Sequence, residues 1–128
     1  MHEHRFFVCQ HCGNMVGLIH DAGVPLHCCG QPMTALEANT VEASSEKHLP
    51  VATVEGNTVR VCVGSAEHPM AEDHLIEWVY LQTAHGGQRK ALAAGQKPEA
   101  VFALVDDKPV AVYAYCDLHG LYKVDVSA

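Results

Sequence analysis

The sequence predicts a mainly β protein in which a small metal-binding N-terminal module precedes an antiparallel β-sandwich of immunoglobulin-like size. Four of the six cysteines fall within the first 29 residues, which marks the first module. Beyond it, alternating apolar and polar segments recur between turn signals, as in an antiparallel sandwich. Apolar residues make up 48% and charged residues 18%, a globular balance. We expect the boundary to separate residues 1–37 from residues 38–128.

The first module contains two cysteine pairs, each followed by glycine. Cys9 and Cys12 lie in CQHCG, and Cys28 and Cys29 lie in CCGQP. Four thiolates at such spacing suit a tetrahedral zinc or iron site, although adjacent cysteines strain a tetrahedron. Two disulfides are the alternative, and a reducing compartment disfavours them.

The stretch between the cysteine pairs predicts a small hairpin. Its apolar runs, 16–19 and 24–26, are separated by HDAG. So few large apolar groups cannot offset the ordering entropy of about 36 residues, so metal binding should contribute to folding. His11, His20 and His27 are expected to be solvated or to make local hydrogen bonds, because four thiolates already complete the site.

The first strands of the second region are predicted from VATVEGNTVRVCVG, a hairpin that turns at Gly56 and Asn57. One face of its second strand carries valines and the other carries Arg60 and Cys62, the latter interpreted as a buried structural thiol. The valines are Val59, Val61 and Val63.

Three further segments complete the predicted sandwich. HLIEWVYLQT alternates Ile76, Trp78 and Tyr80 against the residues between them and predicts a well-covered strand. The segment KALAAGQKPEAVFALV indicates a short strand, a loop and another strand, because Gly95 and Pro98 interrupt a helix. KPVAVYAYC supplies the last strand.

Candidate ligands of a second metal site lie in loops or at strand ends. His48 lies in EKHLP, His68 and His74 in HPMAEDH, and Cys116 and His119 in YCDLHG. Each histidine taken alone would be interpreted as a surface residue or a hydrogen-bonded one, not as a ligand. Loops at one end of a sandwich converge in space, so these groups can meet although they are far apart in sequence. His85, beside Gly86, is expected to be exposed.

Charge and hydropathy exclude two classes of partner. The net charge of −7 argues against nucleic acid, which requires a basic face. The start, MHEHRFFVCQ, is unlike a signal peptide, and no segment reaches the length of a membrane span. We therefore expect a cytoplasmic protein.

The ordered combination CxxCG, CCGQPM, EKHLP, HPM-x3-H and YCDLHG resembles the desulfoferrodoxins, the two-iron class of superoxide reductases, over nearly the whole chain. The resemblance implies a desulforedoxin-like iron centre and a second iron on an immunoglobulin-like sandwich, in a homodimer served by a rubredoxin-like electron donor. The implied ligands are Cys9, Cys12, Cys28 and Cys29 for the first iron, and His48, His68, His74, His119 and Cys116 for the second.

The reaction implied by the resemblance is one-electron reduction of superoxide to hydrogen peroxide. Four imidazoles and one thiolate leave the sixth position of iron open to a small ligand. Lys47 matches a lysine that attracts superoxide and orders water for protonation. Glu46 matches a glutamate that occupies the sixth position of ferric iron. Because the net charge repels an anion, local charge must prevail.

Two other functions are compatible with the cysteines and histidines. The chain could be an electron-transfer protein without turnover, with copper on the sandwich. Blue copper usually takes a methionine shortly after the last histidine, and here Leu121 and Tyr122 follow instead. Zinc at both sites would make the protein purely structural, and such a protein would be colourless and redox-silent.

Overall fold

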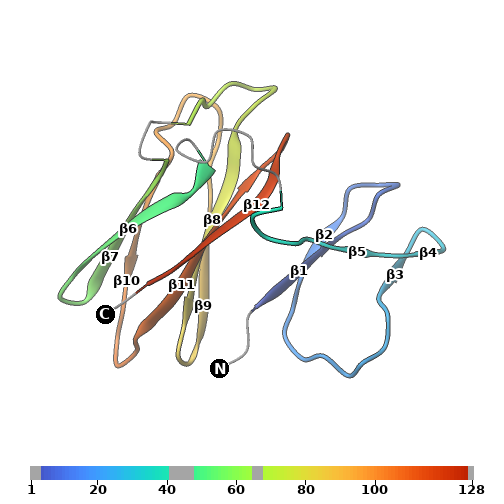
Figure 1. The fold of residues 1–128 in the computed structure, drawn as a ribbon, viewed down its shortest axis with the longest axis horizontal. Coiled ribbons are helices and arrows are strands. Elements are labelled where there is room, and N and C mark those ends of the chain that lie inside the picture. Colours follow the sequence, from blue (N-terminus) through green and yellow to red (C-terminus); the bar gives the residue numbers. More distant parts are fainter. Residues whose placement is uncertain (1–3, 41–47, 65–67, 127–128) are drawn as a thin grey trace. The chain divides into compact units, whose positions relative to one another are not determined.

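The computed structural model describes residues 4–40, 48–64 and 68–126. Contacts divide the chain into two units, Met1–Glu37 and Ala38–Ala128, and both are built from strands (Figure 1). Over the described ranges, no helix has the length and apolar character needed to cross a bilayer.

Two small sheets make up the first unit. In one, β1 (Arg5–Val8) lies between β2 (Met15–Leu18) and β5 (Thr34–Ala35). In the other, β3 (His27–Cys28) pairs antiparallel with β4 (Gln31–Pro32). Each sheet therefore contains or adjoins one of the two cysteine pairs.

The hairpin predicted between residues 16–19 and 24–26 is wrong. The first run lies in β2, which pairs with β1 through Phe6↔Gly17 and Phe7↔Val16. The second run forms no strand: Pro25 has no N–H to donate, and Val24 is 73% exposed. The apolar segment before Cys9 was the better partner for the first run.

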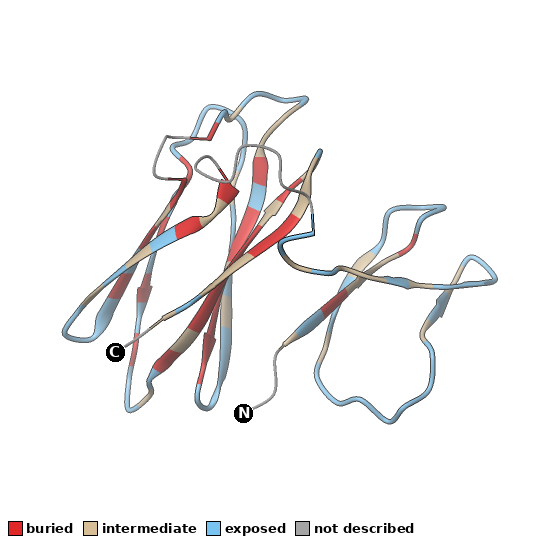
Figure 2. Cartoon of the chain, viewed as in Figure 1, coloured by how far each residue is buried: buried red, intermediate tan, exposed pale blue. Residues whose placement is uncertain are grey.

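Little apolar surface is buried in the first unit. Phe6 and Cys9 are its buried hydrophobic residues, whereas Ile19 is fully exposed. Figure 2 shows the contrast with the second unit, whose strands carry most of the buried positions. The first unit thus lacks a core large enough to stabilise it by hydrophobic burial alone.

Two antiparallel sheets form the second unit, which confirms the predicted sandwich. The three-stranded sheet has the order β10-β7-β6, and the four-stranded sheet has the order β12-β11-β8-β9. The first comprises β6 (Pro50–Glu55), β7 (Thr58–Val63) and β10 (Glu99–Ala103). The second comprises β8 (Ile76–Thr83), β9 (Gly86–Ala91), β11 (Pro109–Cys116) and β12 (Gly120–Asp125).

The core lies between these sheets and follows the alternation of the sequence. Val59, Val61 and Val63 of β7 are buried on one face, as predicted, and the hairpin turns at Gly56 and Asn57. They pack with inward residues of the other strands, among them Phe102 of β10 and Val112 of β11.

One strand departs from its predicted alternation. Tyr115 pairs with Trp78, but the next residue, Cys116, pairs with Ile76, so Glu77 is an extra residue in β8. A bulge of this kind re-aims the side chains beyond it. Ile76 consequently joins the core with Val79 instead of sharing a face with Trp78, and it lies opposite Cys116.

The core predicts the effect of a cavity in the sandwich. Phe102 is fully buried in β10, so Phe102→Ala should lower the free energy of unfolding by about 3–5 kcal/mol, through lost burial and an unfilled cavity. Urea unfolding followed by tryptophan fluorescence measures this. Val101→Ala, on the half-exposed face of the same strand, is the control and should cost far less. Equal effects would contradict the assigned core.

Candidate metal centres

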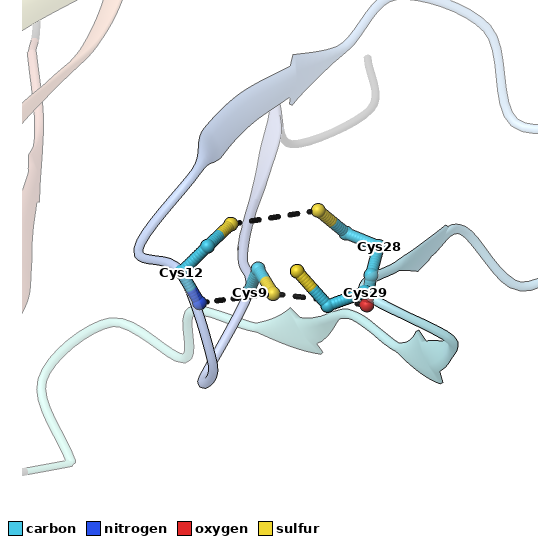
Figure 3. A group of neighbouring side chains, drawn as sticks. All are labelled: Cys9, Cys12, Cys28 and Cys29. Carbon is cyan, nitrogen blue, oxygen red and sulfur yellow. Dashed lines mark hydrogen bonds between the residues drawn. The ribbon is translucent and has the colours of Figure 1, made fainter.

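The four N-terminal cysteines form one compact cluster. Their sulfur atoms all lie within 4.8 Å of one another. Figure 3 shows the side chains of both pairs directed toward a common point, with the sulfurs of Cys12 and Cys28 3.6 Å apart. All of the cysteines are free thiols, so the disulfide alternative is not what the structure adopts.

The local backbone of each pair explains this convergence. The Gly13 N–H donates to the Cys9 carbonyl at 2.9 Å in a turn that Gly13 completes at φ +83°. Cys29 adopts φ +54°, in the left-handed region that non-glycine residues seldom occupy. This reversal of the backbone lets the side chains of two adjacent cysteines reach one point. Adjacent cysteines were expected from the sequence to strain a tetrahedral site.

Hydrogen bonding shifts the pKa values of two of the four thiols in opposite directions. The N–H of Cys12, 3.5 Å from the Cys9 sulfur, is the main cause that lowers the pKa of Cys9 to about 6. Hydrogen bonds with the sulfurs of Cys12 and Cys9 raise the pKa of Cys29 to about 12. Four thiolates cannot accumulate here without a cation, so the cluster suits a metal that displaces the remaining protons.

Strand pairing brings the second set of ligands to one end of the sandwich. His48 precedes β6 and His68 follows β7, and these strand ends are joined by Pro50↔Val63. His74 precedes β8, Cys116 ends β11, and His119 precedes β12. Antiparallel pairing places all these ends on the same side, the upper end of the sandwich in Figure 1.

The four imidazoles form a ring. Neighbouring centroids are 4.6 Å (His48–His68), 4.8 Å (His68–His74), 5.3 Å (His74–His119) and 4.8 Å (His119–His48) apart. The diagonal between His48 and His74 is longer, at 6.3 Å. Adjacent planes are steeply inclined, by 75–88°. Four nitrogen donors can therefore surround one ion.

One hydrogen-bond contact lies within the ring, between His119 Nδ1 and His48 Nε2 at 3.0 Å, but two other ring nitrogens have no such contact. His68 Nδ1 lies 2.6 Å from the Pro69 carbonyl and must donate to it, which leaves Nε2 as an acceptor. Within the described residues, Nε2 of His68 and of His74 are buried and lack a hydrogen-bond partner. Buried polar atoms without partners are costly, and a metal ion would satisfy both.

Burial lowers the pKa of two of the imidazoles, those of His68 and His119. Desolvation is the main cause that lowers the pKa of His68 to about 4, and neighbouring histidines lower it further. The pKa of His119 is lowered for the same reasons. These rings are thus neutral near pH 7 and keep a lone pair for metal binding.

The sulfur of Cys116 completes the donor set. Its ligand atom lies within 4.8 Å of those of His48, His68 and His74, and 3.8 Å from His119 Nδ1. Burial raises the pKa of Cys116, while hydrogen bonds from the N–H groups of Leu118 and His119 lower it. Those two N–H groups would support the thiolate once a cation replaces the proton.

Comparison with known proteins identifies the family. The desulfoferrodoxin profile matches residues 40–125, and the profile of the desulfoferrodoxin N-terminal domain matches residues 2–36. The chain belongs to the desulfoferrodoxin family. It is 44% identical to the desulfoferrodoxin homolog of Archaeoglobus fulgidus, covering 93% of this chain and 94% of that protein. It is 42% identical to the desulfoferrodoxin of Nitratidesulfovibrio vulgaris, covering 96% and 97%.

Solved structures agree with this family assignment. The superoxide reductase of Treponema pallidum matches 96% of this chain and 99% of its own, with a TM-score of 0.81 and 39% identity. A one-iron superoxide reductase of Giardia intestinalis matches 65% of this chain and 99% of its own, with a TM-score of 0.56 and 29% identity.

Some residues singled out from the sequence lie elsewhere. Lys47 and Glu46 fall outside the described residues. Cys62, expected to be buried, is only half-buried, because its face of β7 looks away from the core, where its sulfur lies 3.6 Å from Glu99 Oε1.

The contribution of Tyr122 to the site was not predicted from the sequence. Its buried ring stacks on His48 with centroids 4.8 Å apart and planes inclined by 26°. The stacking fixes the orientation of one imidazole. The signal available was its position three residues after His119, in a segment that alternates like a strand.

The contrast between the two units predicts different responses to metal removal. After chelation of the full chain, backbone amides of β1 and β2 should exchange much faster with solvent, because metal supplies most of the stability of that unit. Amides of β8 and β11 should stay slow, since their core is apolar. Hydrogen exchange by mass spectrometry measures both, and reloading iron is the control. Unchanged protection of β1 would contradict the prediction.

Proposed function

We propose that this chain is a superoxide reductase that converts superoxide to hydrogen peroxide. Each superoxide takes up one electron and two protons and yields one peroxide, without release of dioxygen. The observation that carries the proposal is the ring of four imidazoles, two buried and two half-buried, with the Cys116 sulfur beside it. The superoxide reductases among the similar structures support the same conclusion.

Two mononuclear iron sites follow from the two donor sets. Cys9, Cys12, Cys28 and Cys29 would hold one iron, and the five donors of the sandwich would hold the other. When bound at the second site, ferrous iron would supply the electron for superoxide and a positive charge that attracts it. We further propose that each unit of the chain forms one of these sites as a separate domain.

The chain's own residues keep the second site ready for this chemistry. The lowered pKa values of His68 and His119 keep both rings neutral at physiological pH, so protons do not compete with a metal ion for their lone pairs. Cys116 is fully buried, which shields its sulfur from solvent. The N–H groups of Leu118 and His119 donate hydrogen bonds to that sulfur and stabilise its charged form.

Lys47 is proposed to attract the anionic substrate. The net charge of −7 repels superoxide at long range, so attraction must come from charge within roughly one Debye length, about 8 Å. Lys47 directly precedes the ligand His48 in sequence and also suits water-mediated proton delivery. Glu46 is proposed to take the substrate position after turnover, which would help product leave.

Three further aspects belong to the same proposal. The electron would come from a rubredoxin-like protein, and the chain would act as a homodimer, as its family resemblance implies. A cytoplasmic location is part of the proposal, because a reducing compartment keeps cysteines available as metal ligands.

The donor set distinguishes this function from an electron carrier. Blue copper binds two histidines, a cysteine and a weak axial methionine, whereas four imidazoles converge here. Met70 is engaged elsewhere, because its sulfur accepts the N–H of Ile76 at 3.4 Å. Structural zinc takes four ligands, one fewer than this set offers.

Removing a ligand of the second site should affect that site and leave the four-cysteine centre unchanged. Cys116→Ser and His119→Ala should each abolish superoxide reduction and the visible absorption of the sandwich iron, while the spectrum of the four-cysteine centre stays intact. Absorption spectroscopy and pulse radiolysis measure the two effects. Cys62→Ser and His85→Ala, outside the ring, are matched controls with unchanged activity. Full activity in either ligand variant would defeat the assignment.

Removing the charge of Lys47 should slow the reaction without loss of iron. Lys47→Ala should reduce the second-order rate constant with superoxide by on the order of 10-fold and weaken its dependence on ionic strength, because local steering is lost. Lys47→Arg should retain the salt dependence. Lys108→Ala, before β11 and therefore at the opposite end of the sandwich, is the control. A Lys47→Ala rate equal to that of the unaltered protein would remove the steering role.

A further inference from the structure

Asp117 joins the two loops that carry three of the five donors of the second site. Its backbone N–H donates to the Leu75 carbonyl at 3.2 Å. In return, the Leu75 N–H donates to Asp117 Oδ1 at 3.0 Å. The two residues are 42 positions apart in the sequence. Leu75 follows His74, and Asp117 follows Cys116, so each partner of this clamp is next to a ligand.

The clamp takes over where regular strand pairing stops. The β8–β11 ladder shifts register between Tyr115 and Cys116, and its last pair is Cys116↔Ile76. After that pair the backbone of β11 turns toward His119, so a carbonyl is replaced by the Asp117 carboxylate as the acceptor for Leu75. Without the carboxylate, a partly buried N–H would lose its partner.

The loop that carries His74 is closed by its own internal bonds, and the Asp117–Leu75 contacts extend to it the link with β11 that the Cys116↔Ile76 pair begins. Ala71 and His74 exchange backbone hydrogen bonds at 3.0 and 3.1 Å, which closes the loop on itself. These bonds fix the shape of the loop, but they do not set its distance from Cys116. The Asp117–Leu75 contact ties it to β11, immediately beside the sulfur.

We propose that Asp117 is a positioning residue that holds His74 in register with Cys116 and His119 through its carboxylate contact with the Leu75 N–H. The inference rests on the second metal site of the proposed function, not on turnover. Because supporting groups of metal ligands tune affinity, their loss typically weakens metal binding by about 10–100-fold.

The carboxylate also acts on the site by its charge. Asp117 and Glu77 both place a negative charge near Cys116. Glu77, in the bulge, offers a similar charge without the contact to Leu75. Variants of these two residues can therefore separate the hydrogen bond from the charge.

The test compares release of iron from three variants of the full chain. Asp117→Ala removes both the acceptor and the charge, Asp117→Asn keeps an acceptor oxygen, and Glu77→Gln removes a nearby charge only. Each protein is loaded with Fe(II) and mixed with a chelator, and loss of the sandwich iron is followed spectroscopically against the four-cysteine centre of the same molecule.

Asp117→Ala should release the sandwich iron about 10–100-fold faster than the unaltered protein. Asp117→Asn and Glu77→Gln should release it near the unaltered rate, since the contact with Leu75 is retained. An unaltered rate in Asp117→Ala would overturn the proposal. So would an equal acceleration in Asp117→Asn, because charge rather than the clamp would then be responsible.

A second measurement needs no variant. In the full chain loaded with diamagnetic zinc, NMR should show the Leu75 amide exchanging slowly with solvent, at a rate like that of amides within β8. Rapid exchange at Leu75 would contradict the clamp. Neither experiment uses activity, so failure of the unaltered protein to reduce superoxide would reject the proposed function and leave both comparisons valid.

Discussion

The structure of the second site depends on the cost of burying imidazole nitrogens without partners. Nε2 of His68 and Nε2 of His74 lie in the interior and have no hydrogen-bond partner among the described residues. Such groups are normally satisfied in folded proteins. The sandwich carries this cost because its strand ends converge there, and a cation is the group that all five donors can share. Metal binding, fold and proposed activity are therefore consequences of one arrangement.

The two units solve the problem of holding metal in different ways. In the sandwich, a core that includes Phe102 and Val112 holds the ligands before metal arrives. In the first unit, few apolar residues are buried, and the cysteines converge through turns such as the left-handed backbone at Cys29. Preorganisation suits a site whose donors must keep one position for substrate, whereas a four-thiolate centre can help to fold its own unit.

Much of this could be predicted from the sequence, because alternation reports which side of a strand is buried. The face of β7 that carries Val59 and Val61 was correctly predicted to be buried for that reason. The order of the motifs indicated the family. The bulge at Glu77 could not be foreseen, since nothing in the sequence of β8 marks the extra residue, which shows only in the pairing of β8 with β11. The separate hairpin expected near Val24 failed because its proposed partner pairs with β1 instead.

The most direct test of the proposed superoxide reduction is the product balance when the iron-loaded protein consumes superoxide with a reductant present. Peroxide and dioxygen are measured together while superoxide is supplied enzymatically. Each superoxide consumed should appear as peroxide, and the protein should release no dioxygen. Release of dioxygen in proportion to peroxide would show dismutation and contradict the proposed reduction.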